Sequence, residues 1–314
     1  MNQIPKISII TPSFNQGQYI EQTIDSVLSQ NYPNLEYIII DGGSTDNTVE
    51  IIKKYEKYLK YWVSEPDKGQ SHAINKGFKM ATGDIIAWLN SDDYYLPEAF
   101  EFVAKKFEQN PNIDIIYGDV INFTDKKELY YKVKEFESLD FLSRISIHQP
   151  GVFWRRKLLD EVGLLDETLH YAMDYDLWMR LFFNYKSMKI NKPFAKFRMH
   201  ENSKTSANPP EMYLDYRKVI SRFFNSVGQT NTLNRLKQLK IYDNSKNIKY
   251  NLYDINSSII TRAKKIYIYN CGIQEYTFGS KKKANKLFLH SLISRFWLKT
   301  IIFLVKNNTI GLIK

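Results

Sequence analysis

Two adjacent carboxylates close the motif Asn90, Ser91, Asp92 and Asp93, which directly follows the apolar run GDIIAWL. Like charges at the end of a buried strand repel each other, and a divalent cation would offset that repulsion. Magnesium is commonly held by one or two carboxylates together with substrate phosphates. The motif therefore indicates a site for a cation and phosphates. An exposed acidic turn before the next helix is the structural alternative.

A second polar cluster, DGGSTDNT at residues 41–48, follows the apolar run LEYIII. Asp41 ends the predicted strand, and the two glycines permit a tight turn and close approach of a ligand. Ser44, Thr45 or Asp46 can cap the following helix, whose N-terminus favours anions. A well-capped turn without a ligand is the alternative. The cluster matches neither the dinucleotide fingerprint nor the GxxxxGK[ST] phosphate loop.

Two further candidates lie in the second half of the chain. Asp174 begins the helical pattern MDYDLWMRL, where it could act as a general base toward a hydroxyl or serve only as a helix cap. Asp176 and Arg180 are four residues apart on the same helix and are expected to form a surface salt bridge. His200 is a candidate ligand of a metal or phosphate, although a lone histidine is more often structural.

The elements around these residues alternate between strand and helix. Apolar runs predict strands at residues 6–11, 35–41, 60–67 and 83–89, and helical spacing predicts helices between them and at 96–110. This alternation predicts an α/β fold with a parallel, doubly wound sheet over residues 1 to about 120. The clusters TPSFN, DGGSTD, EPDKGQ and NSDD then lie at the carboxyl ends of the strands, where such sheets bind ligands.

Composition separates the last third of the chain from the rest. The 314 residues carry a net charge of +10, and residues 209–314 hold 19 of the 44 Lys and Arg but only 5 of the 34 Asp and Glu. This basic region is expected to be mostly helical and to contact anionic lipid or a polyanion, or else to be a solvated helical surface. Its end, RFWLKTIIFLVKNNTIGLIK, is typical of interfacial helices, and a core-packing helix is the alternative.

Other classes of protein are disfavoured. No signal peptide or membrane-spanning segment is expected from the sequence, and the single Cys271 excludes an intrachain disulfide. There is no Cys/His cluster of the zinc type and no Ser/His/Asp or Cys/His set. Nucleic-acid binding is disfavoured because no groove-reading or single-strand motif accompanies the basic charge.

The segments SIITPSFNQGQYIEQTIDSVLSQNYPNLEYIIIDGGSTDNTVEIIKKY, SEPDKGQSHAINKGF, ATGDIIAWLNSDDYYLPEAF and MDYDLWMRL together resemble glycosyltransferase family 2. The resemblance spans about residues 5–205 and is nearest to the bacterial branch that builds capsule, O-antigen or other exopolysaccharide. It implies a GT-A fold, with a Rossmann-like, mostly parallel twisted sheet flanked by helices and a helical C-terminal extension. The implied domains are a glycosyltransferase domain at 1–208, with a nucleotide-sugar half at 1–120 and an acceptor half at 121–208, and a basic helical region at 209–314.

The resemblance also implies roles for individual residues. The nucleotide sugar would be bound by Thr11, Pro12, Ser13, Asn15, Asp41, Gly42, Gly43, Ser44, Lys68, Gly69, Asn90 and Asp92. A divalent cation, Mn²⁺ or Mg²⁺, would be held by Asp92, Asp93 and His200. Asp174 stands at the position of the catalytic base, and Gln149, Trp178 and Arg180 stand at acceptor-side or scaffold positions.

Three residues depart from the family pattern. Asn90 replaces the first Asp of the DXD motif and removes one negative charge. Gly42 replaces a second Asp that often contacts the base, so the nucleotide stays open even though a UDP-sugar is the favoured donor. Met173 replaces a Glu before the base, and because an acidic neighbour raises the pKa of a carboxylate, its absence predicts a pKa of Asp174 nearer the ordinary value.

The function expected from these observations is an inverting, metal-dependent transfer of a sugar to a hydroxyl of a glycan or a lipid-linked oligosaccharide in bacterial surface polysaccharide synthesis. The protein would lie in the cytoplasm, with peripheral contact to the inner face of the plasma membrane through its basic region. A non-catalytic nucleotide-sugar-binding subunit of an assembly complex is the alternative. A nucleotidyltransferase is disfavoured because the first strand is not followed by a Gly/Lys/Arg-rich loop.

Overall fold

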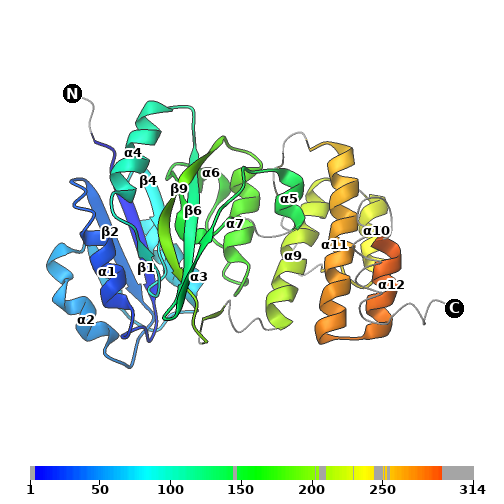
Figure 1. Ribbon diagram of the computed structural model, residues 1–314, viewed down its shortest axis with the longest axis horizontal. Helices are drawn as coiled ribbons and strands as arrows, with labels where there is room; N and C mark the ends of the chain where they lie inside the picture. Colours follow the sequence, from blue (N-terminus) through cyan, green and yellow to red (C-terminus); the bar gives the residue numbers. More distant parts are fainter. Residues whose placement is uncertain are drawn as a thin grey trace. The chain divides into compact units, whose positions relative to one another are not determined.

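The structure is a computed structural model that describes residues 4–143, 147–201, 203–204, 210–228, 230–243, 250, 252 and 255–291. The chain divides into two compact units, residues 1–136 with 146–208 and residues 137–145 with 209–314 (Figure 1). Among the described residues, no helix combines the length and the apolar character that a membrane crossing requires. The terminal stretch 295–314, expected to be interfacial, lies outside the described residues.

The first unit is built around one sheet. Its strands are β1 (Ile7–Ser13), β2 (Leu35–Asp41), β3 (Tyr61–Ser64), β4 (Ile85–Trp88), β5 (Tyr94–Tyr95), β6 (Ile115–Thr124), β7 (Lys127–Tyr131), β8 (Val152–Arg155) and β9 (Ser187–Arg198). Its helices are α1 (Ile20–Leu28), α2 (Thr48–Lys54), α3 (Gln70–Met80), α4 (Ala99–Gln109), α6 (Leu158–Val162) and α7 (Met173–Phe182), with short 3₁₀ turns η1 (Glu56–Tyr58) and η2 (Gln149–Gly151).

The strand order in the described sheet is β3-β2-β1-β4-β8-β6-β9-β5. Strand β7 is not part of this order and pairs with β6. Strands β3, β2, β1 and β4 are parallel, and β8 runs antiparallel to both of its neighbours, β4 and β6. The register places Ser13 beside Asp41 and Asp41 beside Ser64. The polar residues after these strands therefore share one edge of the sheet.

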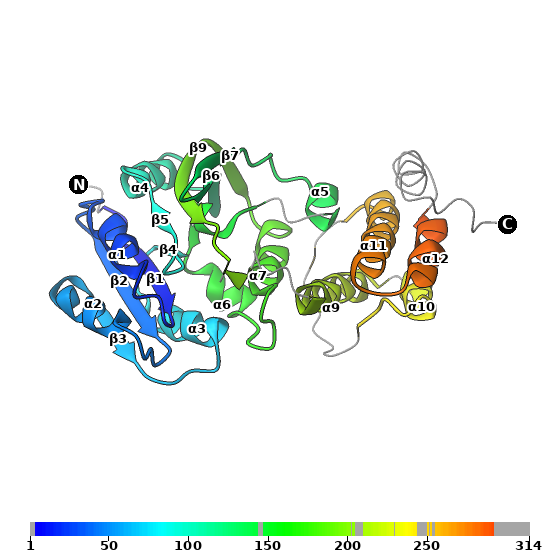
Figure 2. The ribbon, with the colours of Figure 1, turned by 60° about the horizontal axis from the view of Figure 1, so that its bottom comes forward.

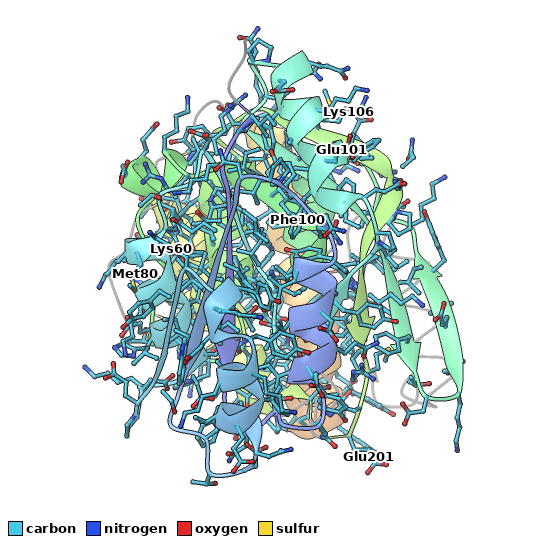
Figure 3. All side chains as sticks on the ribbon, turned by 90° about the vertical axis from the view of Figure 1, so that its left-hand side faces the viewer. Lys60, Met80, Phe100, Glu101, Lys106 and Glu201 are labelled. Atoms are coloured by element: carbon cyan, nitrogen blue, oxygen red, sulfur yellow. The ribbon has the colours of Figure 1, made fainter. Side chains whose placement is uncertain are left out.

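Successive side chains of a strand point to opposite faces of the sheet, so each strand contributes buried residues to both faces. One face packs against α1, α2 and α4 through residues such as Ile9, Ile39 and Phe100. In Figure 2, α1 and α4 lie on one side of the strands and α3 lies on the other. Figure 3 shows Phe100 among the interior side chains and Glu101, the next residue, on the outer surface of α4.

The other face packs against α3 and α7. Gly77 of α3 lies so close to β1 that an added Cβ would stand 2.4 Å from the Ile10 side chain, so only glycine fits there. Trp88 of β4 stacks on Trp178 of α7 with ring centroids 5.5 Å apart and meets Trp154 of β8 edge to face at 5.7 Å. These aromatic contacts fix α7, and with it Asp174, against the sheet.

The predicted α/β class is confirmed, and the strands and helices predicted up to residue 110 are present within a few residues. The sheet extends further than predicted, because β5, β6, β7 and β9 were not identified from the sequence. The apolar pattern of β9 in the sequence is broken by Lys189, Asn191 and Pro193, and the pairing of the strand with β6 shifts register at Asp119. A bulge of this kind removes the alternation on which strand prediction depends.

The second unit is helical in its described residues. It contains α5 (Ser138–Ser143), α9 (Pro210–Ser226), α10 (Thr230–Gln238), α11 (Ser257–Phe278) and α12 (Lys281–Ser291). Helices α11 and α12 pack closely at Gly272, where a Cβ would lie 2.7 Å from the Phe288 ring. Glu275 pairs with Arg217 at 3.2 Å and Lys283 at 2.7 Å, which joins α11 to α9 and α12. The expected helical C-terminal extension is confirmed.

Candidate active site

The loop after β2 is closed by its own aspartate. Asp41 is fully buried, and its carboxylate accepts hydrogen bonds from the Gly43 and Ser44 amides at 3.1 and 2.9 Å. The hydroxyls of Ser44 and Ser64 donate to it at 2.5 and 2.6 Å. Gly43 has φ +85°, and a Cβ there would lie 3.2 Å from the Pro66 nitrogen. The turn therefore needs the glycine, and Asp41 holds the turn.

The loops after β1 and β2 are hydrogen-bonded to each other. Asn15 has φ 51°, and its backbone N–H donates to Ser44 Oγ at 2.7 Å. Its side-chain Oδ1 accepts the backbone N–H of Thr45 at 2.9 Å. The Gly17 amide donates to Asp46 Oδ2 at 2.9 Å. The Phe14 ring, 57% exposed, lies on the same loop. The structure thus brings the predicted nucleotide-binding residues of both loops together.

The two carboxylates of NSDD have different environments. Asp93 is 1% exposed, and its Oδ1 accepts the Arg198 amide of β9 at 2.8 Å. Its own carbonyl accepts the Thr23 hydroxyl of α1 at 2.7 Å. Burial, together with the neighbouring Asp92 charge, holds the pKa of Asp93 well above its ordinary value. Asp93 therefore anchors β9, whereas the Asp92 side chain remains 21% exposed.

Asp92 faces His200, which follows β9. The distance from Asp92 Oδ2 to His200 Nε2 is 3.1 Å. The Nδ1 atom of His200 is buried and has no hydrogen-bond partner among the described residues, and its ring packs on Tyr19 at 4.9 Å. The Asp92 carboxylate suits Mn²⁺ or Mg²⁺ if phosphates supply further oxygens, whereas the imidazole is a ligand type of transition metals. No group of three or more His, Cys, Asp or Glu in the described parts of the chain could hold a metal by itself.

The first turn of α3 connects the loop after β4 to the loop before α7. Gln70 donates its amide to Asn90 Oδ1 at 2.8 Å and accepts the Lys204 ammonium at 3.1 Å. The next residue, Ser71, donates to the Leu169 carbonyl at 3.2 Å. Sequence reasoning did not identify Gln70 or Lys204 as site residues, because neither contact is visible without the fold.

Lys68 and Gly69 precede α3 at the same edge. Gly69 has φ +108°, a conformation that side-chain-bearing residues rarely adopt, and it stands at the N-terminus of the helix. Its amide donates to Asp67 Oδ1 at 2.7 Å. The Lys68 side chain is exposed. Both residues therefore lie at the carboxyl edge, where the sequence predicted nucleotide contacts.

Asp174 lies in the first turn of α7 and is partly buried. Its Oδ1 accepts the amide of the next residue, Tyr175, at 2.7 Å. Burial raises the pKa of Asp174 from an ordinary 3.8 to about 6. The prediction of a pKa nearer the ordinary value was therefore wrong. The absence of an acidic neighbour at Met173 does not keep the value low, because desolvation alone disfavours the charged form.

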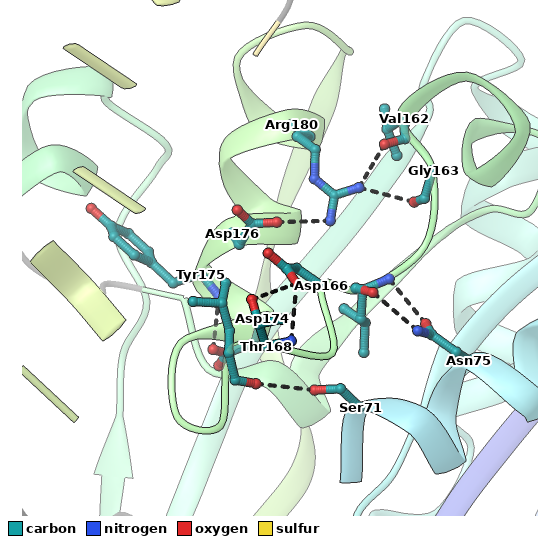
Figure 4. A network of polar contacts seen from close by, with 12 residues as sticks. Ser71, Asn75, Val162, Gly163, Asp166, Thr168, Asp174, Tyr175, Asp176 and Arg180 are labelled. Atoms are coloured by element: carbon teal, nitrogen blue, oxygen red, sulfur yellow. Dashed lines mark hydrogen bonds and ion pairs between the residues drawn. The ribbon is translucent and has the colours of Figure 1, made fainter. Parts of the chain in front are cut away.

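The loop that leads into α7 is fixed by α3 (Figure 4). The Asn75 side chain donates to the Leu165 carbonyl at 3.0 Å and accepts the Leu165 amide at 2.9 Å. It also donates to Glu167 at 3.0 Å. Asp166 accepts the amide and hydroxyl of Thr168 at 2.9 and 2.8 Å, which closes the turn. The position of Asp174 thus depends on side chains about 100 residues earlier in the chain.

The three predicted acceptor-side or scaffold residues differ in environment. Trp178 is fully buried in the aromatic face of the sheet, which favours the scaffold role. Arg180 donates to the Val162 and Gly163 carbonyls at 2.6 and 2.9 Å and pairs with Asp176 at 3.0 Å. This pair is buried, contrary to the predicted surface salt bridge, because α6 covers that side of α7. Gln149 donates to the Trp88 carbonyl at 2.6 Å, and its buried Oε1 has no partner among the described residues.

Comparison with known proteins agrees with this arrangement. The family model described as Glycosyl transferase family 2 matches residues 8–173, more than half of the chain. An uncharacterized glycosyltransferase of Rickettsia prowazekii (strain Madrid E) is 33% identical over 224 residues, which cover 67% of this chain and 70% of that protein.

Solved structures with the same fold include two nucleotide-sugar complexes. S. aureus TarS 1–349 in complex with UDP-GlcNAc superposes with a TM-score of 0.63 at 19% identity, covering 94% of this chain and 79% of that chain. The mannosyltransferase PcManGT from Pyrobaculum calidifontis, in complex with GDP-Man and Mn²⁺, gives a TM-score of 0.53 at 15% identity and covers 100% and 82%. At these identities the likeness shows the fold, which is GT-A. With the family match, the chain belongs to glycosyltransferase family 2 and is a glycosyltransferase.

Proposed function

We propose that this glycosyltransferase carries out an inverting, metal-dependent transfer from a nucleotide-diphosphate sugar to a hydroxyl of a glycan or lipid-linked oligosaccharide. The observation that carries the proposal is the first turn of α3. Its adjacent residues Gln70 and Ser71 join the loop of Asn90 and Asp92 to the loop that leads into Asp174. A donor site and a candidate base are thereby held by one helix.

Asp174 is the proposed general base. With a pKa of about 6 it is mostly ionised at pH 7, and it is a stronger base than an ordinary aspartate. A positioned base of this kind contributes about 10²–10⁴-fold to the rate. It would take the proton of the acceptor hydroxyl while that oxygen attacks the anomeric carbon opposite the leaving nucleotide. One such displacement inverts the anomeric centre and needs no covalent intermediate.

The proposed donor lies across the carboxyl edge of β1, β2, β3 and β4. Asp92 and His200 would hold Mn²⁺ or Mg²⁺, as supported by their contact at 3.1 Å and by the Mn²⁺ in PcManGT. When bound, the cation acts as a Lewis acid that stabilises negative charge on the diphosphate. Besides the cation, the Lys204 ammonium places a positive charge near the loop of Asn90 and Asp92, because it donates to Gln70, which bonds Asn90. Asp93 contributes by fixing Arg198 and thus the approach of His200.

If the acceptor is a lipid-linked oligosaccharide, the basic second unit would contact the inner face of the membrane that carries it. Lys281, Lys282 and Lys286 of α12 are exposed. Each lysine near an anionic surface contributes about 1 kcal/mol to binding. Changing these three to Gln should reduce sedimentation with vesicles containing phosphatidylglycerol but not with phosphatidylcholine alone. The matched control changes three exposed lysines of the first unit, Lys57, Lys60 and Lys79. Equal loss in both variants would discard a specific membrane role of α12.

A donor screen tests the enzymatic proposal. The full chain is incubated with UDP-, GDP- and dTDP-sugars, with Mn²⁺ or with EDTA, and donor hydrolysis and binding are recorded. The proposal expects turnover with one donor class, lost in EDTA and strongly reduced by Asp174→Asn. Binding without hydrolysis or transfer to any acceptor would instead indicate a non-catalytic nucleotide-sugar-binding subunit.

A further inference from the structure

The strand order determines where the base of a donor must lie. If the diphosphate lies at the end of β4, beside Asp92 and the first turn of α3, two directions are open along the sheet. The neighbour β8 is antiparallel, so its carboxyl end lies at the opposite edge. In the other direction β1, β2 and β3 all end at this edge, about 5, 10 and 14 Å away at the usual strand spacing. A nucleoside therefore reaches the ends of β2 and β3.

Asp41, the carboxylate at the end of β2, cannot read that base. It has no exposed surface, and four protein donors occupy its two oxygens. The neighbouring residue Ser13 is 6% exposed, and its buried hydroxyl has no partner among the described residues. Asp41 therefore has no oxygen left for a base, and any carboxylate that contacts the base would come from another loop.

Asp67, in the loop after β3, is such a carboxylate. Its Oδ1 accepts the Gly69 amide at 2.7 Å, which fixes the side chain. Its Oδ2 lies over Gly42, where an added Cβ would stand only 2.8 Å from it. Among the described residues no donor bonds Oδ2, and the side chain is partly exposed. The present position of the Asp67 carboxylate thus depends on the absence of a side chain at position 42.

We propose that Asp67 Oδ2 selects the donor nucleotide by accepting the ring N–H on the pairing edge of its base. The inference rests on the proposed function, since it assumes that a nucleotide sugar lies along this edge. An ionised carboxylate only accepts hydrogen bonds. Uracil and thymine (N3–H) and guanine (N1–H) offer the required donor, whereas cytosine and adenine present a ring acceptor there. Uracil is the first base to test.

The test compares nucleotide affinities of the full chain by calorimetry with Mn²⁺ present. Wild-type protein should bind UDP more tightly than CDP, and N3-methyl-UDP should bind about 10- to 100-fold more weakly than UDP, as expected for a lost hydrogen bond to a charged group. If GDP is the tightest ligand, N1-methyl-GDP serves in the same way. This arm needs no variant. Tightest binding of CDP or ADP, or tolerance of the methyl group, would overturn the inference.

Asp67→Asn provides the second arm. The amide retains an oxygen for the Gly69 N–H and places an N–H donor where Oδ2 lies. The ratio of UDP to CDP affinity should therefore fall at least about 10-fold, because cytosine N3 now finds a donor. Glu65→Gln is the matched control, since this carboxylate of the same loop pairs with Lys76. Its ratio should stay at the wild-type value.

The outcomes separate the two proposals. If nucleotides bind and sugar is transferred but Asp67→Asn leaves the ratio unchanged, the base-reading role is wrong and the enzymatic proposal stands. If instead the variant loses affinity equally for UDP and CDP, and 2′-deoxy-UDP binds wild-type protein weakly, Asp67 binds the ribose and the base-reading role is wrong. If no nucleotide binds at all, the proposed function fails and the base-reading role with it.

Discussion

The imidazole Nε2 of His200 lies 3.1 Å from the carboxylate Oδ2 of Asp92, although 108 positions separate the two residues in the chain. The contact exists because β5, which follows Asp92 and Asp93, pairs with β9, which precedes His200. Asp93 reinforces the pairing through the Arg198 amide. The candidate metal pair is therefore brought together by the pairing of β9 with β5. The other oxygen ligands of the cation would come from the diphosphate of the donor.

His200→Gln should weaken binding of Mn²⁺ in the presence of UDP by at least about 10-fold, since changes around metal ligands commonly cost 10- to 100-fold in affinity. Water-proton relaxation measures this binding without any turnover. His72→Gln is the control, because His72 lies on α3 and does not contact Asp92. Unchanged Mn²⁺ affinity in His200→Gln would remove His200 from the proposed ligands.

Asp174→Asn should lower kcat by about 10²–10⁴-fold, with donor affinity unchanged. For the wild type, burial raises the pKa of this carboxyl to about 6, so the base loses its charge as the pH falls through 6. A plot of kcat/KM against pH should therefore show an acidic limb near pH 6, and the residual activity of the variant should lack it. Asp160→Asn, an exposed carboxylate of α6, should leave both quantities at the wild-type values. A limb that persists in Asp174→Asn would assign it to another group.

The same substitution should stabilise the fold at neutral pH. Because the folded-state pKa of Asp174 lies above its ordinary 3.8, the folded protein binds this proton more tightly than the unfolded chain. The stability it contributes is present below pH 3.8 and is lost as the pH rises through 6. The difference between a pKa of 3.8 and one of about 6 corresponds to about 3 kcal/mol in the free energy of unfolding.

Asp174→Asn should accordingly raise the free energy of unfolding by up to about 3 kcal/mol above pH 7, and by under about 1 kcal/mol near pH 4. Urea unfolding at the two pH values measures the difference. If the variant is less stable than the wild type at pH 7.5, the ionised carboxylate of Asp174 does not destabilise the folded protein.

Asn75→Ala should affect both stability and turnover, because this 3% exposed side chain bonds the amide and carbonyl of Leu165. Leaving these buried groups without partners costs about 1–3 kcal/mol each. We expect a loss of about 2–4 kcal/mol in the free energy of unfolding and a lower kcat with little change in the donor KM. Ser71→Ala, which removes one bond to the same loop, should cost about 1 kcal/mol. Equal kcat in Asn75→Ala and the wild type would show that the loop does not position Asp174.

The sequence by itself determined the strands and helices of the first 110 residues and the clustering of polar residues at the strand ends. These features are local. The buried runs of β1, β2 and β4, the helical spacing between them and the glycines at 42, 43 and 69 act within a few residues of chain. A parallel sheet then brings the strand ends together whatever the rest of the protein does. Membership of glycosyltransferase family 2 followed from the same motifs.

Only the tertiary structure decided what individual site residues experience. The sequence presents Asp92 and Asp93 as equivalent, but β9 buries one and leaves the other beside His200. It also gives no sign that burial raises the pKa of Asp174, or that Asp67 fills the space above Gly42. Desolvation and contacts between distant loops depend on how the whole sheet packs. A one-dimensional pattern carries periodicity but not those distances.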